Sequence, residues 1–302
     1  MSPTTRLGRS VTLLQSRAED RLRRSTKWIR DRRRERLVFP PPTAVKVERV
    51  VAGVLEIRLS AGDRRNVLGR ATIDRIDEIV ADPPHGTKVI VITAEPPDFC
   101  AGYDFIEASR GEAETLIAHE GNFAALRSSL LPIVVALHGN VIGGGLELAL
   151  LADVRVASVE TKFAIPASKL GLTYSENGVR LVVDAFGQSV ARSMFLGGRV
   201  VTAEMALSMG VISEIVNREQ LRVLTLELAT SMAEWSPEAS SGNRQILDVV
   251  AGRVVRDTDA LHRASFASNG TLAQTIAAFT ARRSAAIKKT SAPATSNEPQ
   301  PT

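Results

Sequence analysis

Runs of β-branched and other apolar residues recur along this chain, and stretches with helical periodicity lie between them. KVIVITA, IVVALHG and VRVAS are each short, continuous and apolar, which is typical of a buried strand. RATIDRIDEIVAD, in contrast, places its isoleucines and Val80 on one helical face. Strands that alternate with helices predict an α/β fold, in which helices cover layers of sheet. Upstream of these runs, VKVERVVAGVLEIRLSA predicts a hairpin that turns near Ala52 and Gly53.

Composition divides the chain into four parts. Residues 1–42 are rich in arginine and end in FPPP, which stops a helix and forms a stiff spacer, so we expect a basic, disordered extension. Residues 43–198 carry the alternating pattern and form the predicted core. Residues 199–285 have helical patterns and residues 286–302 the composition of a disordered tail.

The excess positive charge belongs to the extension. Residues 1–42 hold twelve Lys and Arg against four Asp and Glu, whereas the rest of the chain carries more acidic than basic residues. The core therefore lacks the charge signature of nucleic-acid binding, and only the extension suits weak contact with an anionic surface. The single cysteine, Cys100, allows no intrachain disulfide, and no apolar run is long enough to span a membrane. These features predict a cytoplasmic protein.

Two glycine-containing turns carry the strongest chemical signal. Residues 138–150 read HGNVIGGGLELAL, with Glu147 soon after three consecutive glycines, and residues 96–108 read PPDFCAGYDFIEA. Each turn lies where a predicted strand ends and a predicted helix begins, so each offers backbone N–H groups without helical partners. Two such N–H groups that converge on one oxygen would form an oxyanion hole, which stabilises charge that develops on a carbonyl.

Several other chemistries are excluded or weakly supported. The chain has no P-loop motif, no G-x-S-x-G elbow, and no H-E-x-x-H or C-x-x-C spacing, so we expect no metal site. GGGLEL meets G-x-G-x-x-G only in its first two glycines, which gives weak support to a dinucleotide site.

The ordered series of motifs resembles the enoyl-CoA hydratase/isomerase, or crotonase, superfamily. F-C-A-G-Y-D is followed about forty residues later by I-G-G-G-L-E-L-A, and R-N-V-L, A-D-V-R-V-A, K-L-G-L and V-I-S-E-I-V resemble further segments of that family. The similarity spans roughly residues 45 to 285. It implies a spiral of ββα units, followed by a C-terminal helical region that assembles trimers, often paired into hexamers.

The resemblance also implies an acyl-CoA substrate, with coenzyme A as part of that substrate and no separate cofactor. The thioester oxygen would be held by the backbone N–H groups of Tyr103 and Gly144, and the bulk of Tyr103 would reshape the acyl pocket. The residues that match the family's CoA-binding and substrate-binding positions are Tyr103, Asp104, Phe105, Ile106, Gly144, Phe279 and Arg283.

The carboxylates depart from the family pattern. The first glutamate of a two-glutamate hydratase maps to Glu147, but the second maps to Ala167 in F-A-I-P-A, and alanine cannot move a proton. Glu176, in YSENG, is the candidate for a relocated second acid. Weaker candidates for proton transfer are His119, Glu120 and His138.

Three interpretations of the sequence remain open. The first is an enoyl-CoA hydratase or isomerase that stabilises a thioester enolate in a backbone oxyanion hole, with Glu147 alone or with Glu176. A double-bond shift needs one base and tolerates the loss of the second glutamate better than hydration does. The second is another crotonase-type reaction, namely thioester hydrolysis, C–C cleavage or decarboxylation. The third is a CoA-binding subunit with little catalytic activity.

Overall fold

The computed structural model describes residues 45–108 and 122–252, and the statements below concern these residues. In chain order the elements are β1 (Val45–Val51), β2 (Val54–Leu59), the 3-10 helix η2 (Gly62–Arg64), α2 (Arg70–Ala81), β3 (Val89–Ala94), α3 (Phe105–Glu107), α5 (Ala124–Ser128), β4 (Ile133–Leu137), β5 (Asn140–Ile142), α6 (Gly144–Leu150), β6 (Val154–Ser158), β7 (Lys162–Ala164), α7 (Ala167–Leu170), α8 (Glu176–Gly197, with a kink at Gly187), β8 (Val200–Thr202), α9 (Ala203–Ser208), β9 (Glu214–Val216), α10 (Arg218–Ala233) and α11 (Pro237–Val250).

A six-stranded sheet forms the centre of the fold, in the order β1-β2-β3-β4-β6-β9. All neighbouring pairs are parallel except β1 and β2, which form the predicted antiparallel hairpin. Gly53, at the hairpin turn, has a φ of 84°, in the left-handed region that glycine adopts without strain. The predicted strands at 88–94, 133–139 and 154–158 are confirmed as β3, β4 and β6.

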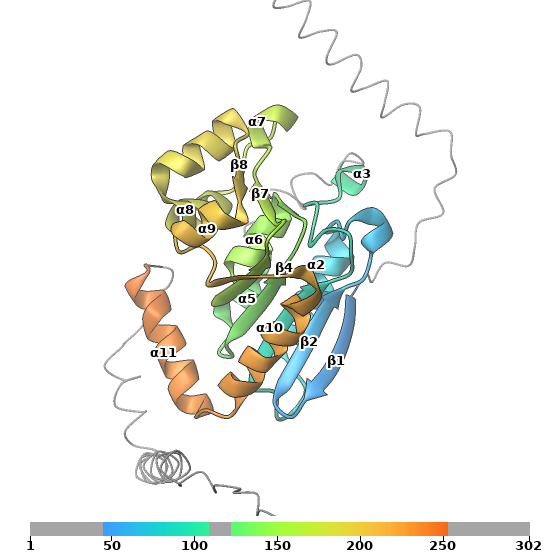
Figure 1. Cartoon of the computed structure of the whole chain (residues 1–302), viewed down its shortest axis with the longest axis vertical. Coiled ribbons are helices and arrows are strands. Elements are labelled where there is room, and N and C mark those ends of the chain that lie inside the picture. Colours follow the sequence, from blue (N-terminus) through green and yellow to red (C-terminus); the bar gives the residue numbers. More distant parts are fainter. Residues whose placement is uncertain (1–44, 109–121, 253–302) are drawn as a thin grey trace, which may run out of the picture. The chain divides into compact units, whose positions relative to one another are not determined.

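Alternate residues of the sheet pack on opposite sides. On one side, Val89 and Val91 of β3 contact α10 through Ala229 and Ala233. Figure 1 shows α10 lying across this face of the sheet. On the other side, the isoleucines of β3 lie in the main core with the buried face of α2, as its helical periodicity predicts. Both faces are therefore covered, which explains the continuous apolar character of the strands.

A second, three-stranded sheet has the order β5-β7-β8. The chain leaves β4 through His138 and Gly139, enters this small sheet as β5, and then reaches Gly143, the residue that precedes α6. Each strand of the small sheet has only three residues, which is too short for a periodic pattern to predict it. The region after residue 199 likewise contains two short strands, β8 and β9, besides its helices.

An arginine anchors α11 to the rest of the fold. Arg244 is almost fully buried, and its Nε donates to Asp153 Oδ2 at 3.0 Å. Its remaining guanidinium nitrogens donate to the backbone carbonyls of Leu126 and Ser129 and to Asp248. These contacts balance the buried charge, which would otherwise be costly.

The described residues contain neither a membrane-spanning helix nor a cluster of metal ligands. No helix there is both long and apolar enough to cross a lipid bilayer. No group of three or more His, Cys, Asp or Glu side chains in residues 45–108 and 122–252 is arranged to hold a metal ion.

Candidate active site

The two glycine turns lie side by side because backbone hydrogen bonds join the segments that lead into them. The Phe99 N–H donates to the His138 carbonyl at 2.8 Å, and the Cys100 N–H donates to the Asn140 carbonyl at 3.1 Å. The Ile142 N–H donates back to the Cys100 carbonyl at 3.0 Å. This short parallel pairing of Cys100 with Val141 brings both segments to the same place beside the small sheet, and each segment begins its turn there.

The R-N-V-L segment holds the first turn from its other side. The Ala101 N–H donates to the Arg65 carbonyl at 2.9 Å, and the Leu68 N–H donates to the Gly102 carbonyl at 2.8 Å. The buried Asn66 amide donates to two further carbonyls of the incoming loop, at 2.7 and 2.8 Å. A buried polar side chain that is fully bonded in this way fixes the loop conformation.

The N–H groups of Tyr103 and Gly144 make no hydrogen bond to another described residue. The two turns are also close, since a Cβ built on Gly102 would lie 3.6 Å from the Gly144 nitrogen. Gly102 has a φ of 97°, so only glycine adopts this backbone without strain. Two adjacent, uncommitted amides are what an oxyanion hole requires, and the hole itself stays a prediction.

The glycine run at 143–145 is packed against side chains of the protein. A Cβ on Gly144 would lie 2.7 Å from the ring of Tyr103, and a Cβ on Gly145 would lie 2.5 Å from the Cβ of Cys100. Gly143 has a φ of 56°, and a Cβ there would lie 2.9 Å from the Tyr174 hydroxyl oxygen. We expected a substrate carbonyl to be the group that needs these glycines. The structure shows that the close approach of α6 to the first turn requires them, and the contact with a substrate carbonyl stays a prediction.

Glu147 lies in the first turn of α6, where the helix dipole favours a negative charge. Its side chain is buried, with the residue only 3% exposed. The Tyr103 hydroxyl donates to Glu147 Oε2 at 3.2 Å. Gly178 of α8 leaves room for the carboxylate, since a Cβ at that position would lie 3.0 Å from Oε2. The site therefore brings together a carboxylate, a phenol and the two uncommitted amides.

A second hydrogen bond, from Asn122, holds the phenol of Tyr103 in place. Asn122 Nδ2 donates to the Tyr103 hydroxyl oxygen at 3.4 Å, and Arg70 donates to Asn122 Oδ1 at 2.8 Å. Burial and the nearby charge of Glu147 raise the pKa of Tyr103 far above its ordinary value. The hydroxyl therefore stays protonated and acts as a hydrogen-bond donor to the carboxylate.

Tyr174, which lies just before α8, is also near Glu147, but among the hydrogen bonds of the described residues its hydroxyl makes none to the carboxylate. Its ring packs edge-on against Phe195, with centroids 5.3 Å apart and planes at 78°. Burial and the charge of Glu147 raise its pKa too. The Tyr174 hydroxyl has no hydrogen-bond partner among the described residues. Its surroundings are those of a packing residue.

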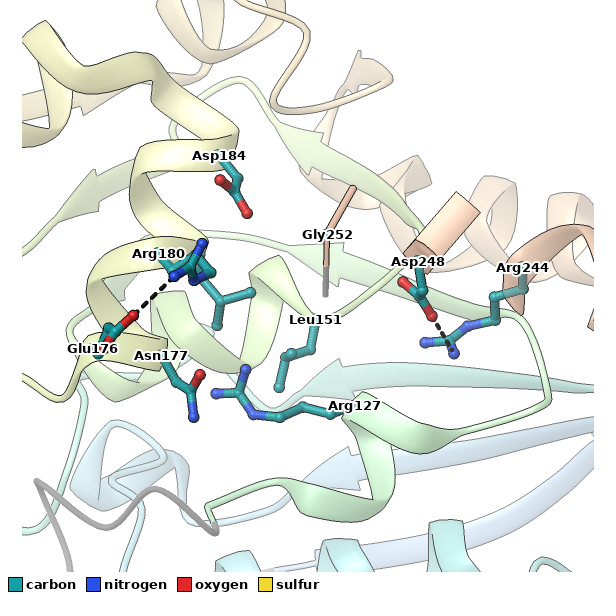
Figure 2. A pocket seen from close by; sticks show the side chains of 10 residues that line it. Arg127, Leu151, Glu176, Asn177, Arg180, Asp184, Arg244, Asp248 and Gly252 are labelled. Atoms are coloured by element: carbon teal, nitrogen blue, oxygen red, sulfur yellow. Dashed lines mark hydrogen bonds and ion pairs between the residues drawn. The ribbon is translucent and has the colours of Figure 1, made fainter. Parts of the chain in front are cut away.

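Glu176 does not reach Glu147 in this structure. Its side chain is 81% exposed and pairs with Arg180 at 2.8 Å. Gly178, two positions along α8, faces Glu147, and two residues correspond to about 200° around a helix, so Glu176 faces away. Figure 2 shows Glu176 beside a cavity of about 560 Å³ instead. The cavity is lined by Arg127, Leu151, Glu176, Asn177, Arg180, Leu181, Asp184, Arg244, Asp248 and Gly252. Ala167 is buried at the start of α7, so the family's second acid position is apolar here.

In the predicted CoA-binding stretch, Asp104 is held by hydrogen bonds and the apolar side chains that follow it are exposed. Asp104 caps α3 by accepting from the N–H groups of Ile106 and Glu107, and it pairs with Arg64. Phe105 and Ile106 remain exposed, at 45% and 39%. The other predicted residues, Phe279 and Arg283, lie outside the described residues, as do the weaker candidates His119 and Glu120.

His138 faces a different cavity, of about 190 Å³, between β3, β4 and α10. Burial and the charge of Arg218 lower its pKa to about 4, so the imidazole is neutral near pH 7. Its Nε2 is buried without a hydrogen-bond partner in the described part of the chain. This position does not support the weaker hypothesis that His138 exchanges protons with a thioester held at the glycine turns.

Two features of the site were missed at the sequence level. The sequence predicted Tyr103 as an amide donor and as a bulky side chain, and not as a partner of Glu147. A signal existed, because Tyr103 replaces the small residue usual in the family. Asn122 carries no comparable signal, since it reaches Tyr103 only through the tertiary fold.

Comparisons with known proteins agree with the geometry. The family model for enoyl-CoA hydratase/isomerase matches residues 49–284. A carnitinyl-CoA dehydratase from Salmonella arizonae is 33% identical over 168 residues, which are 55% of this chain and 64% of that protein. The match thus spans slightly less than two thirds of that relative.

Two further relatives extend the comparison. A 2,3-dehydroadipyl-CoA hydratase from Escherichia coli K12 is 32% identical, over 64% of this chain and 78% of that protein. The crystal structure of an enoyl-CoA hydratase subunit I from Geobacillus kaustophilus HTA426 superimposes with a TM-score of 0.70 at 25% identity, covering 80% of this chain and 96% of that one. Since the family model covers well over half of the sequence and the fold agrees, the chain belongs to the enoyl-CoA hydratase/isomerase family, the crotonase superfamily.

Proposed function

We propose that this protein adds water to, or removes water from, an α,β-unsaturated acyl-CoA. Glu147 serves as the base, and the N–H groups of Tyr103 and Gly144 bind the thioester oxygen. One observation carries the proposal: a buried carboxylate lies three residues after an uncommitted Gly144 amide, beside a second uncommitted amide. Two relatives, a carnitinyl-CoA dehydratase and a 2,3-dehydroadipyl-CoA hydratase, support this choice of reaction.

The two amides suit the charge that such a reaction creates. Attack of water at Cβ places negative charge on the thioester oxygen as an enolate forms. Preorganised N–H donors stabilise that charge, and the loss of one donor typically costs about 100- to 1,000-fold in kcat. Apolar neighbours of Glu147 on α6 exclude water from the carboxylate, so its charge acts on the substrate with little screening.

The CoA moiety would bind along the stretch from Tyr103 to Ile106. The exposed side chains of Phe105 and Ile106 offer an apolar surface next to the proposed hole. Phe279 and Arg283 complete this proposal from the sequence, with Arg283 suited to phosphate. Coenzyme A enters as part of the substrate, and no other cofactor is needed. The single cysteine of the sequence, Cys100, suits a reducing compartment such as the cytoplasm.

A double-bond shift is the second candidate function. Ala167 supplies no acid at the family's second position, and Glu176 points away from Glu147. A single base that removes a proton at one carbon and returns it at another would need neither. The products separate the two candidates, because hydration gains a molecule of water and isomerisation does not.

The test measures turnover of a panel of enoyl-CoA esters by the wild-type protein and by two glutamate variants. Glu147→Gln keeps the size of the side chain and removes its proton exchange, so we expect turnover to fall by at least about 100-fold while thioester binding persists. Glu176→Gln is the matched control, and we expect it to retain activity because that side chain is exposed and paired with Arg180.

Each outcome separates the alternatives. Full activity in Glu147→Gln would show that another group moves the proton. A large loss in Glu176→Gln would show that α8 rearranges to bring a second acid to the substrate. Thioester binding without any turnover by the wild-type protein would support the interpretation as a CoA-binding subunit.

A further inference from the structure

Both tyrosines of this chain lie beside Glu147. The sequence contains two tyrosines, Tyr103 and Tyr174, and the negative charge of Glu147 acts on each of them. Of these two tyrosines, Tyr103 donates a hydrogen bond to the carboxylate. Ala167 stands at the position of the family's second glutamate. Among the described residues, the group bonded to Glu147 is the phenol of Tyr103.

Three contacts hold the Tyr103 hydroxyl in one place. It donates to Glu147 Oε2 at 3.2 Å and accepts from Asn122 at 3.4 Å. Its ring lies against the α-carbon of Gly144, where a Cβ would come within 2.7 Å of the ring carbons. The phenol is therefore fixed between the carboxylate and the second proposed amide donor, close to where the carbons of a bound thioester would lie.

We propose that the Tyr103 hydroxyl is the second proton-transfer group of this site, in place of the missing glutamate. The proposal rests on the proposed hydration reaction and deepens it. Tyr103 would then serve twice, since its backbone N–H binds the thioester oxygen and its side chain delivers a proton to the adjacent α-carbon. A phenol is chemically suited to this task because an enolate carbon is a stronger base than a phenolate.

The step balances without any further reactant. Glu147 removes a proton from water as the water oxygen forms its bond to Cβ and the double-bond electrons move toward the thioester. The Tyr103 O–H bond then breaks and its proton forms the new C–H bond at Cα. The proton held by Glu147 passes across the 3.2 Å hydrogen bond to the Tyr103 oxygen, which restores both groups. Dehydration follows the same steps in reverse.

The local electrostatics agree with this cycle. While Glu147 is ionised, the burial of the phenol and the charge of Glu147 keep Tyr103 protonated, so the donor is ready before water attacks Cβ. Once Glu147 has taken a proton, the charge that opposes ionisation of the phenol is gone. Protonation of Glu147 therefore makes proton release by Tyr103 easier, and a tyrosine without a neighbouring carboxylate would lack this assistance.

A pair of matched variants tests the proposal. Tyr103→Phe keeps the ring on Gly144 and removes only the hydroxyl, and we expect kcat for hydration to fall by at least about 100-fold with KM changed less than about three-fold. Tyr174→Phe removes the other hydroxyl near Glu147, and that hydroxyl makes no hydrogen bond to a described residue. We expect this variant to keep activity within about three-fold of wild type. Deuterium incorporation at Cα in D2O should fall with hydration in Tyr103→Phe.

Fluorinated tyrosines give a readout that a structural role would not move. In the Tyr174→Phe background, Tyr103 is the only tyrosine, so metabolic incorporation modifies it alone. The acid must be protonated to act, so its contribution is lost as pH rises through its pKa. Burial and the charge of Glu147 hold the phenol pKa far above its ordinary value. Stepwise fluorination lowers that pKa, so an alkaline loss of kcat should enter the measurable pH range and move to lower pH with each added fluorine.

The outcomes are distinct for this proposal and for the proposed function. Hydration by the wild type that is lost in Glu147→Gln but kept in Tyr103→Phe would overturn the role of Tyr103 and leave the hydratase intact. A pH profile of kcat whose alkaline side does not move on fluorination would also overturn the role of Tyr103. Absence of hydration with every enoyl-CoA ester tested would overturn the proposed function, and the role of Tyr103 with it.

Discussion

At the residue scale, His138 makes the stability of the protein depend on pH. Its pKa is lowered from 6.5 to about 4 by burial and by the charge of Arg218. The unfolded chain therefore binds a proton at a pH where the folded chain does not, and stability is lost as pH falls from about 6.5 toward 4. At pH 5 we expect this histidine to lower the free energy of unfolding by about 2 kcal/mol relative to pH 7.

Urea unfolding at pH 7 and at pH 5 measures this difference. His138→Asn should reduce the difference between the two pH values, whatever its effect on stability at pH 7. The matched control is His85→Asn, which removes an exposed histidine and should leave the difference as in the wild type. An unchanged difference in His138→Asn would show that His138 is not the group that titrates.

Residue identities could be predicted from the sequence where the backbone acts, and less well where side chains meet. The two glycine turns were predicted from local patterns, because glycines at strand ends report local conformation. Their assignment to the N–H groups of Tyr103 and Gly144 came from the family resemblance and stays a prediction. The bond from Tyr103 to Glu147 depends on how two turns pack, and no local pattern encodes it. Glu176 illustrates the same limit, since its position on the exposed side of α8 follows from the start of that helix at Ser175.

At the scale of the element, α6 packs against the first turn more closely than a helix with side chains at its start would permit. All seven of its residues are buried. A Cβ on Gly145 would lie 2.5 Å from the Cβ and 2.7 Å from the sulfur of Cys100, in a region with little room to shift. We expect Gly145→Ala to lower the free energy of unfolding by about 1 to 3 kcal/mol, as overpacking of a core does.

The same substitution at an open position is the control for Gly145→Ala. Gly197 lies at the end of α8, and a Cβ added there would meet no neighbour within 4 Å. Gly197→Ala should be neutral or should add up to about 1 kcal/mol, because alanine restricts the unfolded chain. Chemical denaturation measures the free energy of unfolding of both variants. Equal values would show that α6 shifts to accommodate the Cβ without loss of stability.

The longer elements were predictable, and the short ones were not. β3, β4 and α2 have enough residues for a period of 2 or 3.6 to stand out, and their buried faces match the expected ones. β5, β7 and β8 have three residues each, and their pairing is decided by where longer elements place them. The small sheet that positions α6 was therefore beyond what the sequence pattern could reveal.

At the scale of the whole molecule, α11 presents an apolar edge. Leu247 and Val250 lie one turn apart on this helix and are 67% and 79% exposed. Large exposed aliphatic side chains on one helical face favour burial against another protein surface. We therefore expect the protein to form the trimer or hexamer that its family resemblance implies, with α11 in the interface.

Mass photometry or sedimentation velocity measures the assembly directly. The double variant Leu247→Glu, Val250→Glu places two charges in the expected interface and should shift the protein to smaller species. Val159→Glu, between β6 and β7, introduces a charge at a half-exposed apolar residue and serves as control. A wild-type protein that is monomeric at micromolar concentration would contradict the prediction.

The backbone hydrogen bonds between residues 99–100 and 138–142 also have a consequence for folding. They join segments separated by about forty residues, so the chain must close a long loop, at an entropic cost, before either glycine turn has its partner. The site is thus absent from any intermediate that contains only local structure. A bound thioester would hold this closure in place, and hydrogen exchange at the two turns should slow together, as one cooperative unit.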